Sequence, residues 1–153
     1  MDLILWRHAD ADVMHSGQAD NDRPLTARGE RHALKMAQWL ERKLPDTAKI
    51  IASPTLRAEQ TLLPLGRKFK SRDELQPNGN VEDLLELAKW PNHKQTVLVV
   101  SHQPLIGQTI AYLLGIHKQE LSIKKCSIWW LRSSISSGSI STQVVTVQTP
   151  DML

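Results

Sequence analysis

Short continuous apolar runs alternate along this chain with longer segments whose apolar residues recur every three or four positions. The runs Leu3–Trp6, Lys49–Ala52 and Thr96–Val100 have the length and composition of β-strands that are buried on both faces of a sheet. Helical spacing extends from Thr26 to about Lys43, and Val81 to about Trp90 is a second predicted helix with acidic residues in its first turn. This alternation of strands and helices predicts an α/β protein.

Two further helices are predicted directly after buried strands. One follows Lys49–Ala52, with Ser53 as its N-cap and Pro54 at its first helical position, and is interrupted at Pro64. The other follows Pro104 and is capped by Gly115. Both helices therefore begin at the carboxyl end of a predicted strand.

The last part of the chain predicts an antiparallel pair of strands. These are Ser127–Leu131 and Gln143–Thr149, joined by the Ser/Gly-rich segment Ser133–Ser141 as a hairpin loop. The complete order of elements predicts a three-layer α/β/α sandwich with a mostly parallel sheet and an antiparallel edge. We expect residues 1–153 to form a single domain.

Composition narrows the class of protein. The chain has 153 residues, of which 41% are hydrophobic and 23% charged, and its net charge is +3. The excess of basic residues is small and forms no block, so nucleic-acid binding is weakly supported, and a cationic site for an acidic or phosphorylated substrate explains the charge equally well. Cys126 is the only cysteine, which excludes a disulfide framework and a CxxC metal or redox motif.

The distribution of apolar residues also bears on location. The chain has no basic start followed by a long apolar stretch, and no run approaches the roughly 18 apolar residues that span a bilayer. We therefore expect a cytoplasmic protein with no membrane partner, and a monomer, because a chain of this length needs no partner to fold.

Charged and polar residues follow three of the predicted strands. Arg7-His8 ends the first strand, Ser53 to Arg57 follow the second, and His102 follows the central one. Since functional residues of α/β folds gather at the carboxyl ends of the strands, we expect these side chains to share one site. Each has a structural alternative: Arg7-His8 as a solvated pair where a strand ends at the surface, Arg57 as a helix-surface arginine and His102 as a buried core histidine.

These residue types match the needs of phosphoryl transfer to a histidine. A neutral imidazole attacks phosphorus, while fixed donors bind the charged equatorial oxygens. Arginine suits the second task because its planar fork binds two oxygens and keeps its charge. His8, Arg7, Arg57 and His102 supply these parts without a metal or other cofactor.

Three motifs in order resemble a known family. They are Arg7-His8-Ala9, the segment from Ser53 to Thr61 that reads SPTLRAEQT, and Val99 to His102. Together they resemble the motifs of the histidine phosphatase (phosphoglycerate-mutase-like) superfamily. The small size and the segment from Asp20 to Thr26 are most similar to the SixA-type phosphohistidine phosphatases.

The resemblance implies a phosphoglycerate-mutase-like fold and a role for each motif residue. It implies His8 as the phosphorylated nucleophile and Arg7, Arg57 and His102 as the phosphate pocket. Arg23 would be an accessory phosphate or substrate contact; its structural alternative is to cap a carbonyl or to pair with a nearby aspartate. The chain departs from the family at Ala9, where glycine is usual, and a side chain there is strained if the position needs a positive φ.

A general acid is weakly indicated. The larger family members carry it in an insertion after the second motif, but here that stretch, Gln76 to Gln95, reads mostly as a structural helix. Asp20 is the favoured candidate from its place in the SixA-like motif, with a solvated loop carboxylate as the alternative. A phosphorylated histidine needs an acid less than an alkyl ester does, because its leaving nitrogen is readily protonated.

The missing cap insertion also predicts a shallow, open pocket. Small metabolites are usually enclosed, whereas an open pocket suits a phosphorylated side chain of another protein. We therefore expect a phosphohistidine phosphatase that acts on a histidine phosphotransfer domain or a phosphocarrier protein. The alternatives are a broad small-molecule phosphomonoesterase with the same mechanism, and a phosphate-binding regulator without turnover.

Overall fold

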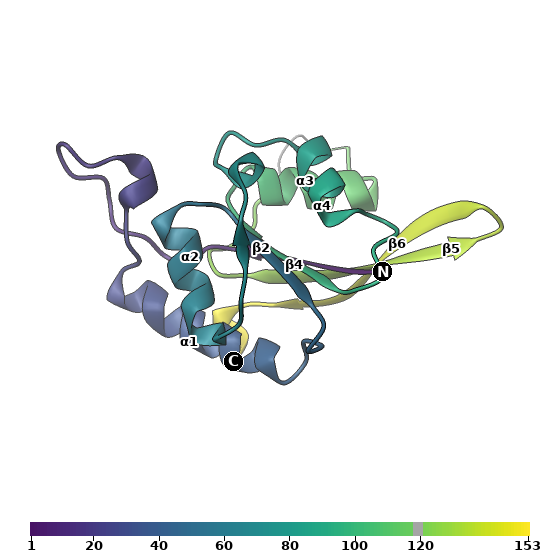
Figure 1. Cartoon of the computed structure of the whole chain (residues 1–153), viewed down its shortest axis with the longest axis horizontal. Helices are drawn as coiled ribbons and strands as arrows, with labels where there is room; N and C mark the ends of the chain where they lie inside the picture. The colour runs from purple at the N-terminus through teal and green to yellow at the C-terminus, as the bar shows by residue number, and fades with distance from the viewer. Residues whose placement is uncertain (118–120) are drawn as a thin grey trace.

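A six-stranded sheet in the order β3-β2-β4-β1-β5-β6 forms the centre of the molecule (Figure 1). The computed structural model describes residues 1–117 and 121–153. The strands are β1 Asp2–Arg7, β2 Lys49–Ala52, β3 Lys70–Ser71, β4 Val97–Ser101, β5 Ile128–Ser136 and β6 Ser139–Gln148. The α-helices are α1 Ala27–Glu41, α2 Leu56–Leu62, α3 Val81–Ala88 and α4 Leu105–Leu114. Short 3₁₀ turns are η1 Asp20–Asp22, η2 Leu63–Leu65, η3 Asp73–Leu75 and η4 Pro150–Met152.

The strand directions confirm the predicted sheet. Strand β1 pairs parallel with β4, β4 with β2, and β2 with β3, whereas β5 is antiparallel to β1 and β6 to β5. Strand β3 was not predicted, because a two-residue strand of exposed polar residues has no hydrophobic pattern of its own.

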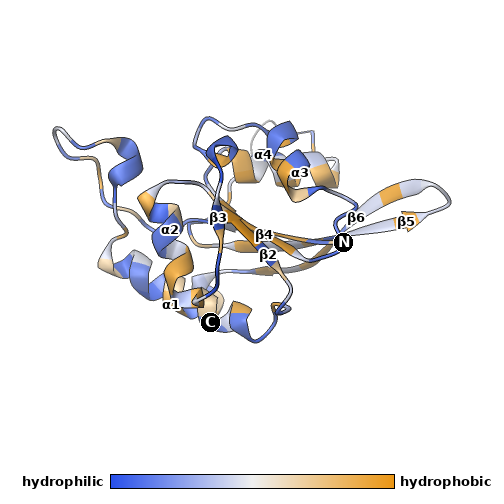
Figure 2. Cartoon of the chain, viewed as in Figure 1, coloured by the Kyte–Doolittle hydropathy of each residue, from blue (hydrophilic) through white to orange (hydrophobic). Residues whose placement is uncertain are grey.

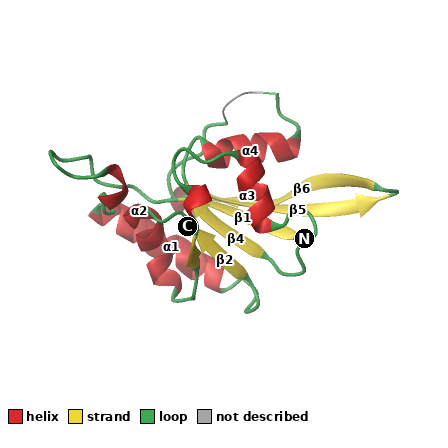
Figure 3. Cartoon of the chain, turned by 45° about the horizontal axis from the view of Figure 1, so that its top comes forward, coloured by secondary structure: helices red, strands yellow, loops and turns green. Residues whose placement is uncertain are grey.

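Helices cover both faces of the sheet and give the predicted three layers (Figure 3). Successive residues of β1 point to opposite faces: Ile4 and Trp6 belong to the core that contains the buried side of α1, while Leu3 and Leu5 pack with α3 and α4. Figure 2 shows the resulting concentration of hydrophobic residues along the central strands. Two-sided burial explains why the strand sequences are continuously apolar.

The helix between Gln76 and Gln95 belongs to the sheet layers and not to a cap. Leu84 and Ala88 of α3 are fully buried in the core shared with α4. This agrees with the predicted absence of a cap insertion over the strand ends.

The start of α2 corrects a prediction. Thr55, not Ser53, occupies the N-cap position, and Pro54 precedes the helix instead of opening it. The hydroxyl of Ser53 is instead engaged with His102, at 2.7 Å from Nε2. A tertiary partner has therefore replaced the local capping interaction that the sequence predicted.

The Ser/Gly-rich segment is a second correction. It was predicted as a loop over 133–141, yet β5 and β6 continue through it and pair as far as Ser136 with Ser139. Only Ser137 and Gly138 form the turn, both with positive φ, as a two-residue hairpin turn requires. The hairpin extends beyond the body of the protein (Figure 1), so its strands need few apolar residues.

Among the helices of residues 1–117 and 121–153, none combines the length and apolar character that crossing a membrane demands.

Candidate active site

Strand register brings the predicted site residues together at one edge of the sheet. Arg7 of β1 is paired with Ser101 of β4, and the next backbone amide, that of His8, donates to the Ser101 carbonyl at 3.1 Å. His8 and His102 therefore follow neighbouring parallel strands at the same level, and their ring centroids lie 5.1 Å apart. This is the meeting of strand ends that the sequence predicted.

The ring of His8 is held in one tautomer. Its Nδ1 lies 2.7 Å from the carbonyl oxygen of Ala9. Because a carbonyl oxygen only accepts hydrogen bonds, Nδ1 must carry the proton. In the neutral ring the lone pair is then on Nε2, which is the atom left for nucleophilic attack.

Both histidines are neutral at physiological pH. Burial lowers the pKa of His8 to about 4, with the nearby arginines adding to the effect, while the hydrogen bond to Ala9 opposes it. Burial also lowers the pKa of His102 to about 3, helped by the charges of His8 and Arg57. Since only a neutral imidazole is nucleophilic, these surroundings favour attack by His8.

Two arginines, Arg7 and Arg57, place hydrogen-bond donors in the same cavity as the two histidines. Arg57 is 3% exposed, and its Nη1 and Nη2 contact the carbonyl and the carboxylate of Asp20 at 2.8 and 3.0 Å. Arg7 donates from Nη1 to the Ile123 carbonyl at 2.6 Å. The Nε atoms of both arginines have no protein acceptor within the described residues. A buried guanidinium with uncommitted donors suits an oxyanion such as a phosphoryl group.

Asp20 links two of the predicted cations. Its carboxylate binds Arg57 through one oxygen and Arg23 Nε through the other, the latter at 2.9 Å. Arg23 also donates from Nη1 to the Asp12 carbonyl at 2.8 Å, so the pairing and the carbonyl contact considered from the sequence both occur. Burial by itself would raise the pKa of Asp20, but its hydrogen bonds and proximity to Arg57 and Arg23 outweigh this and lower it. A carboxylate that stays ionised donates no proton, which counts against the predicted role of Asp20 as the acid.

A cavity of about 340 Å³ unites these groups. Its lining contains all six predicted site residues together with four others: Arg7, His8, Asp20, Arg23, Arg57, His102, Ala11, Pro77, Gln103 and Lys125. Gln103 and Lys125 were not predicted from the sequence. Gln103 directly follows His102 and was detectable from that position, whereas Lys125 comes from a segment with no motif.

Further contacts fix the backbone next to His8. The amide of Ala9 donates to Thr61 Oγ1 at 3.0 Å, and this hydroxyl donates to the Arg57 carbonyl at 2.7 Å. Thr61 thus joins the residue that fixes the His8 tautomer to the helix that carries Arg57. The motif from Ser53 to Thr61 contained this residue, but its role required the fold.

The alanine at the usual glycine position is accommodated. Ala9 is fully buried in the core and is not among the residues with positive φ. Its methyl group therefore packs without the backbone strain considered from the sequence.

The described part of the chain contains no cluster of side chains suited to binding a metal ion. No group of three or more His, Cys, Asp or Glu side chains there is arranged to hold an ion. The cavity is instead lined by three guanidiniums and the ammonium group of Lys125, and these groups bind anions.

The fold and this site define a histidine phosphatase. The model of the histidine phosphatase superfamily (branch 1) matches residues 3–87, and the chain belongs to that family. Within it the chain is of the SixA type. It is 34% identical over 131 residues to the phosphohistidine phosphatase SixA homolog of Haemophilus influenzae, covering 75% of this chain and 78% of that protein. It is also 34% identical to phosphohistidine phosphatase SixA of Escherichia coli strain K12 over 121 residues, 74% of each chain.

Solved structures agree with these sequence relationships. A protein histidine phosphatase SixA complexed with tungstate superimposes with a TM-score of 0.77 over 99% of both chains at 28% identity. The SixA-type structure from Nakamurella superimposes with a TM-score of 0.78 at 29% identity, over 97% of this chain and 95% of that one. The fold is thus shared over nearly the whole chain.

Proposed function

We propose that this protein removes the phosphoryl group from a phosphorylated histidine of a partner protein, through a covalent phosphohistidine on His8. The observation that carries the proposal is the state of His8: a neutral ring whose Nδ1–H is held by Ala9, with Nε2 free beside Arg7, Arg57 and His102. Membership in the SixA-type group supports phosphohistidine as the substrate class.

The reaction proceeds in two displacements. Nε2 of His8 attacks the phosphorus, and the bond between phosphorus and the substrate nitrogen breaks as the new bond forms. When the second nitrogen of the substrate ring carries a proton, that ring leaves as neutral imidazole. Arg7, Arg57 and His102 stabilise the charged phosphoryl oxygens during the transfer.

Water completes the cycle. It attacks the phosphorus of phosphorylated His8, the bond to Nε2 breaks, and the oxygen and protons of water leave with inorganic phosphate. His8 departs as a neutral ring because Nδ1 keeps the proton that it donates to Ala9. Both leaving groups are therefore imidazoles, and neither step depends on a strong acid such as an alkyl ester would need.

The geometry of the cavity supports a protein substrate. Its volume of about 340 Å³ lies at the lower end of the range for small-molecule pockets, roughly 300–1,000 Å³. Asp20 and Lys125 on its lining are half exposed, so a side chain can enter from outside. We expect the physiological partner to resemble a histidine phosphotransfer domain or a phosphocarrier protein.

A quenched-flow experiment with ³²P-labelled phosphotransfer domain tests the proposal. The wild type and the control His15→Ala should release phosphate rapidly and carry an acid-labile, base-stable label on the enzyme. His8→Ala should carry no label and lose at least about 10³-fold in rate, as expected when a nucleophile is removed. Label on another residue would refute the mechanism. Much faster hydrolysis of small phosphate esters than of the phosphoprotein would refute the substrate class.

A further inference from the structure

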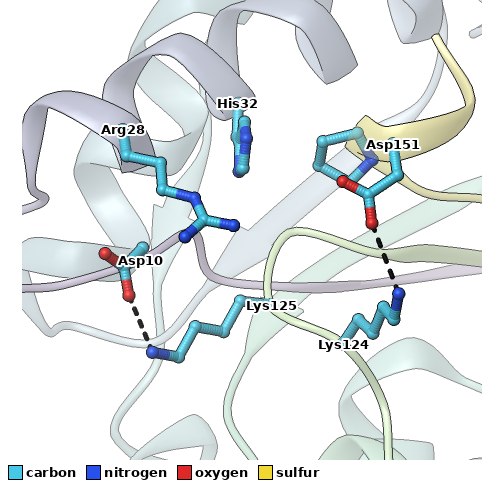
Figure 4. Close-up of a pocket in the computed structure, with 7 residues that line it drawn as sticks. Asp10, Arg28, His32, Lys124, Lys125 and Asp151 are labelled. Carbon is cyan, nitrogen blue, oxygen red and sulfur yellow. Dashed lines mark hydrogen bonds and ion pairs between the residues drawn. The ribbon is translucent and has the colours of Figure 1, made fainter.

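A second hollow of about 310 Å³ lies beside the catalytic cavity. It is formed by the first turns of α1, by the segment before β5 and by η4 near the C-terminus, and Figure 4 shows the side chains of Arg28 and His32 directed from α1 toward the other two segments. Lys125 lines both the hollow and the catalytic cavity. The two sites are therefore neighbours on one continuous surface.

Positive charge predominates in this hollow. Of its three permanent cations, Lys125 is paired with Asp10 at 2.7 Å and Lys124 with Asp151 at 3.3 Å. Arg28 forms no ion pair within residues 1–117 and 121–153, and it is exposed. His32 lies one helical turn after Arg28, on the same face of α1. Asp10 is near enough for the charge of Arg28 to lower its pKa, but its carboxylate is already paired with Lys125, so the Arg28 guanidinium has no ion-pair partner of its own among the described residues.

The existing pairs indicate the ligand chemistry. Both lysines already bind carboxylates, and the free cation is an arginine, whose fork matches a carboxylate with two parallel hydrogen bonds. The surplus of a single permanent positive charge fits a singly charged acidic side chain better than a second dianionic phosphate. The open, half-exposed rim excludes deep enclosure of a small molecule.

We propose that this hollow binds an acidic side chain of the phosphoprotein substrate, close in sequence to its phosphohistidine. The inference rests on the proposed function, because Lys125 connects the hollow to the cavity that receives the phosphoryl group. Arg28 would then set preference among phosphoproteins without touching the reacting atoms.

Two synthetic peptides test this proposal, each with a central phosphohistidine and flanked by either glutamates or glutamines. The wild type should have a KM about three- to tenfold lower for the glutamate peptide, a preference that weakens with added salt, as is usual for rim charges. Arg28→Glu should abolish or reverse the preference with kcat unchanged. Hydrolysis of phosphoramidate, which has a P–N bond but no flanking residues, should be the same in both enzymes.

Arg42→Glu provides the matched control. It changes the net charge equally but lies at the C-cap of α1, 14 residues further along, about 21 Å at 1.5 Å per residue. It should leave the peptide preference intact. Equal KM values for the two peptides with the wild type, or an Arg28→Glu effect that extends to phosphoramidate, would overturn the inference while leaving the proposed function in place. Failure of the wild type on both peptides and on a phosphotransfer domain, with phosphoramidate still hydrolysed, would instead refute the protein substrate itself.

Discussion

At the level of single side chains, Asp20 and the incoming phosphate compete for the same donors. The Asp20 carboxylate binds Arg57 and Arg23, the cations that the proposed mechanism assigns to the phosphoryl group and its surroundings. Its contacts with these arginines, which lower its pKa despite burial, keep it ionised. Its negative charge should therefore weaken the binding of phosphate.

Replacement of Asp20 distinguishes this competition from acid catalysis. Asp20→Asn keeps the backbone contact to Arg57 but removes the charge, so inorganic phosphate should inhibit about three- to tenfold more strongly, the effect of roughly 1 kcal/mol of repulsion. The kcat for an alkyl phosphate ester, whose leaving oxygen must gain a proton, should stay within about tenfold, whereas loss of a general acid costs about 10²–10⁴. Asp22→Asn, in the same 3₁₀ turn, is the control, and a loss of kcat beyond a hundredfold would establish Asp20 as the acid.

At the level of elements, the contact between the end of β1 and α2 positions His8, the proposed nucleophile. Thr61 of α2 accepts the Ala9 amide, and Ala9 in turn accepts the Nδ1–H of His8. A helix hydroxyl thus determines where the imidazole points. The same helix carries Arg57, so α2 holds both the proposed nucleophile and a guanidinium proposed to bind the phosphoryl group.

Thr61→Val should remove the hydrogen bonds of the Thr61 hydroxyl while keeping the size of the side chain. The Ala9 amide would lose its acceptor in a fully buried place, which costs about 1–3 kcal/mol of the free energy of unfolding. The reoriented His8 should lower kcat with little change in KM. Thr61→Ser should restore kcat because it keeps the hydroxyl.

Thr109→Val is the matched control for this element. Thr109 of α4 is also fully buried and donates to a carbonyl four residues earlier, but it does not contact the site. Urea unfolding and steady-state kinetics on the wild type and the three variants measure the loss of stability and of kcat separately. Equal kcat values for the Thr61→Val and Thr109→Val enzymes would show that Thr61 only stabilises the fold.

At the level of the whole molecule, the two buried histidines of the site make the free energy of unfolding depend on pH. Their pKa values in the folded protein are about 4 and about 3, compared with 6.5 for an unperturbed histidine. Between these values the unfolded chain binds more protons than the folded one. The stability from their neutral burial is fully present above pH 6.5 and is lost as the pH falls through the folded-state values.

Urea unfolding at pH 7.0, 5.5 and 4.5 measures this coupling. The wild type should lose stability toward acid, with each histidine contributing on the order of 3 kcal/mol at the acid end of the range. His102→Gln should have a shallower pH dependence because one titrating group is gone, and the exposed His15→Gln should follow the wild type. Parallel curves for the wild type and His102→Gln would contradict the prediction.

The sequence predicted most of the architecture, because its strongest patterns are those of two-sided burial. The apolar runs of β1, β2 and β4 and the helical spacing of α1 were recognised correctly, since both depend on local periodicity. The hairpin was wrong over 133–141 because strands outside the core carry no such periodicity. Arg7, His8, Arg57 and His102 were predicted from their places after buried strands, Arg23 and Asp20 from the family resemblance alone, and one cavity contains all six.

The sequence by itself determined the three-layer fold, the placement of His8 and His102 at strand ends and the choice of arginines, because period, strand length and motif spacing are local properties of the chain. Only the tertiary structure decided the tautomer of His8 and the hydrogen bond of Ser53 to His102 in place of a helix cap. It also decided that Asp20 pairs with two arginines and that Lys125 lines the cavity. The contacts of Ser53 with His102 and of Asp20 with Arg57 join segments distant in sequence, and their geometry is set by strand register and packing. The contacts of His8 with Ala9 and of Asp20 with Arg23 are local in sequence.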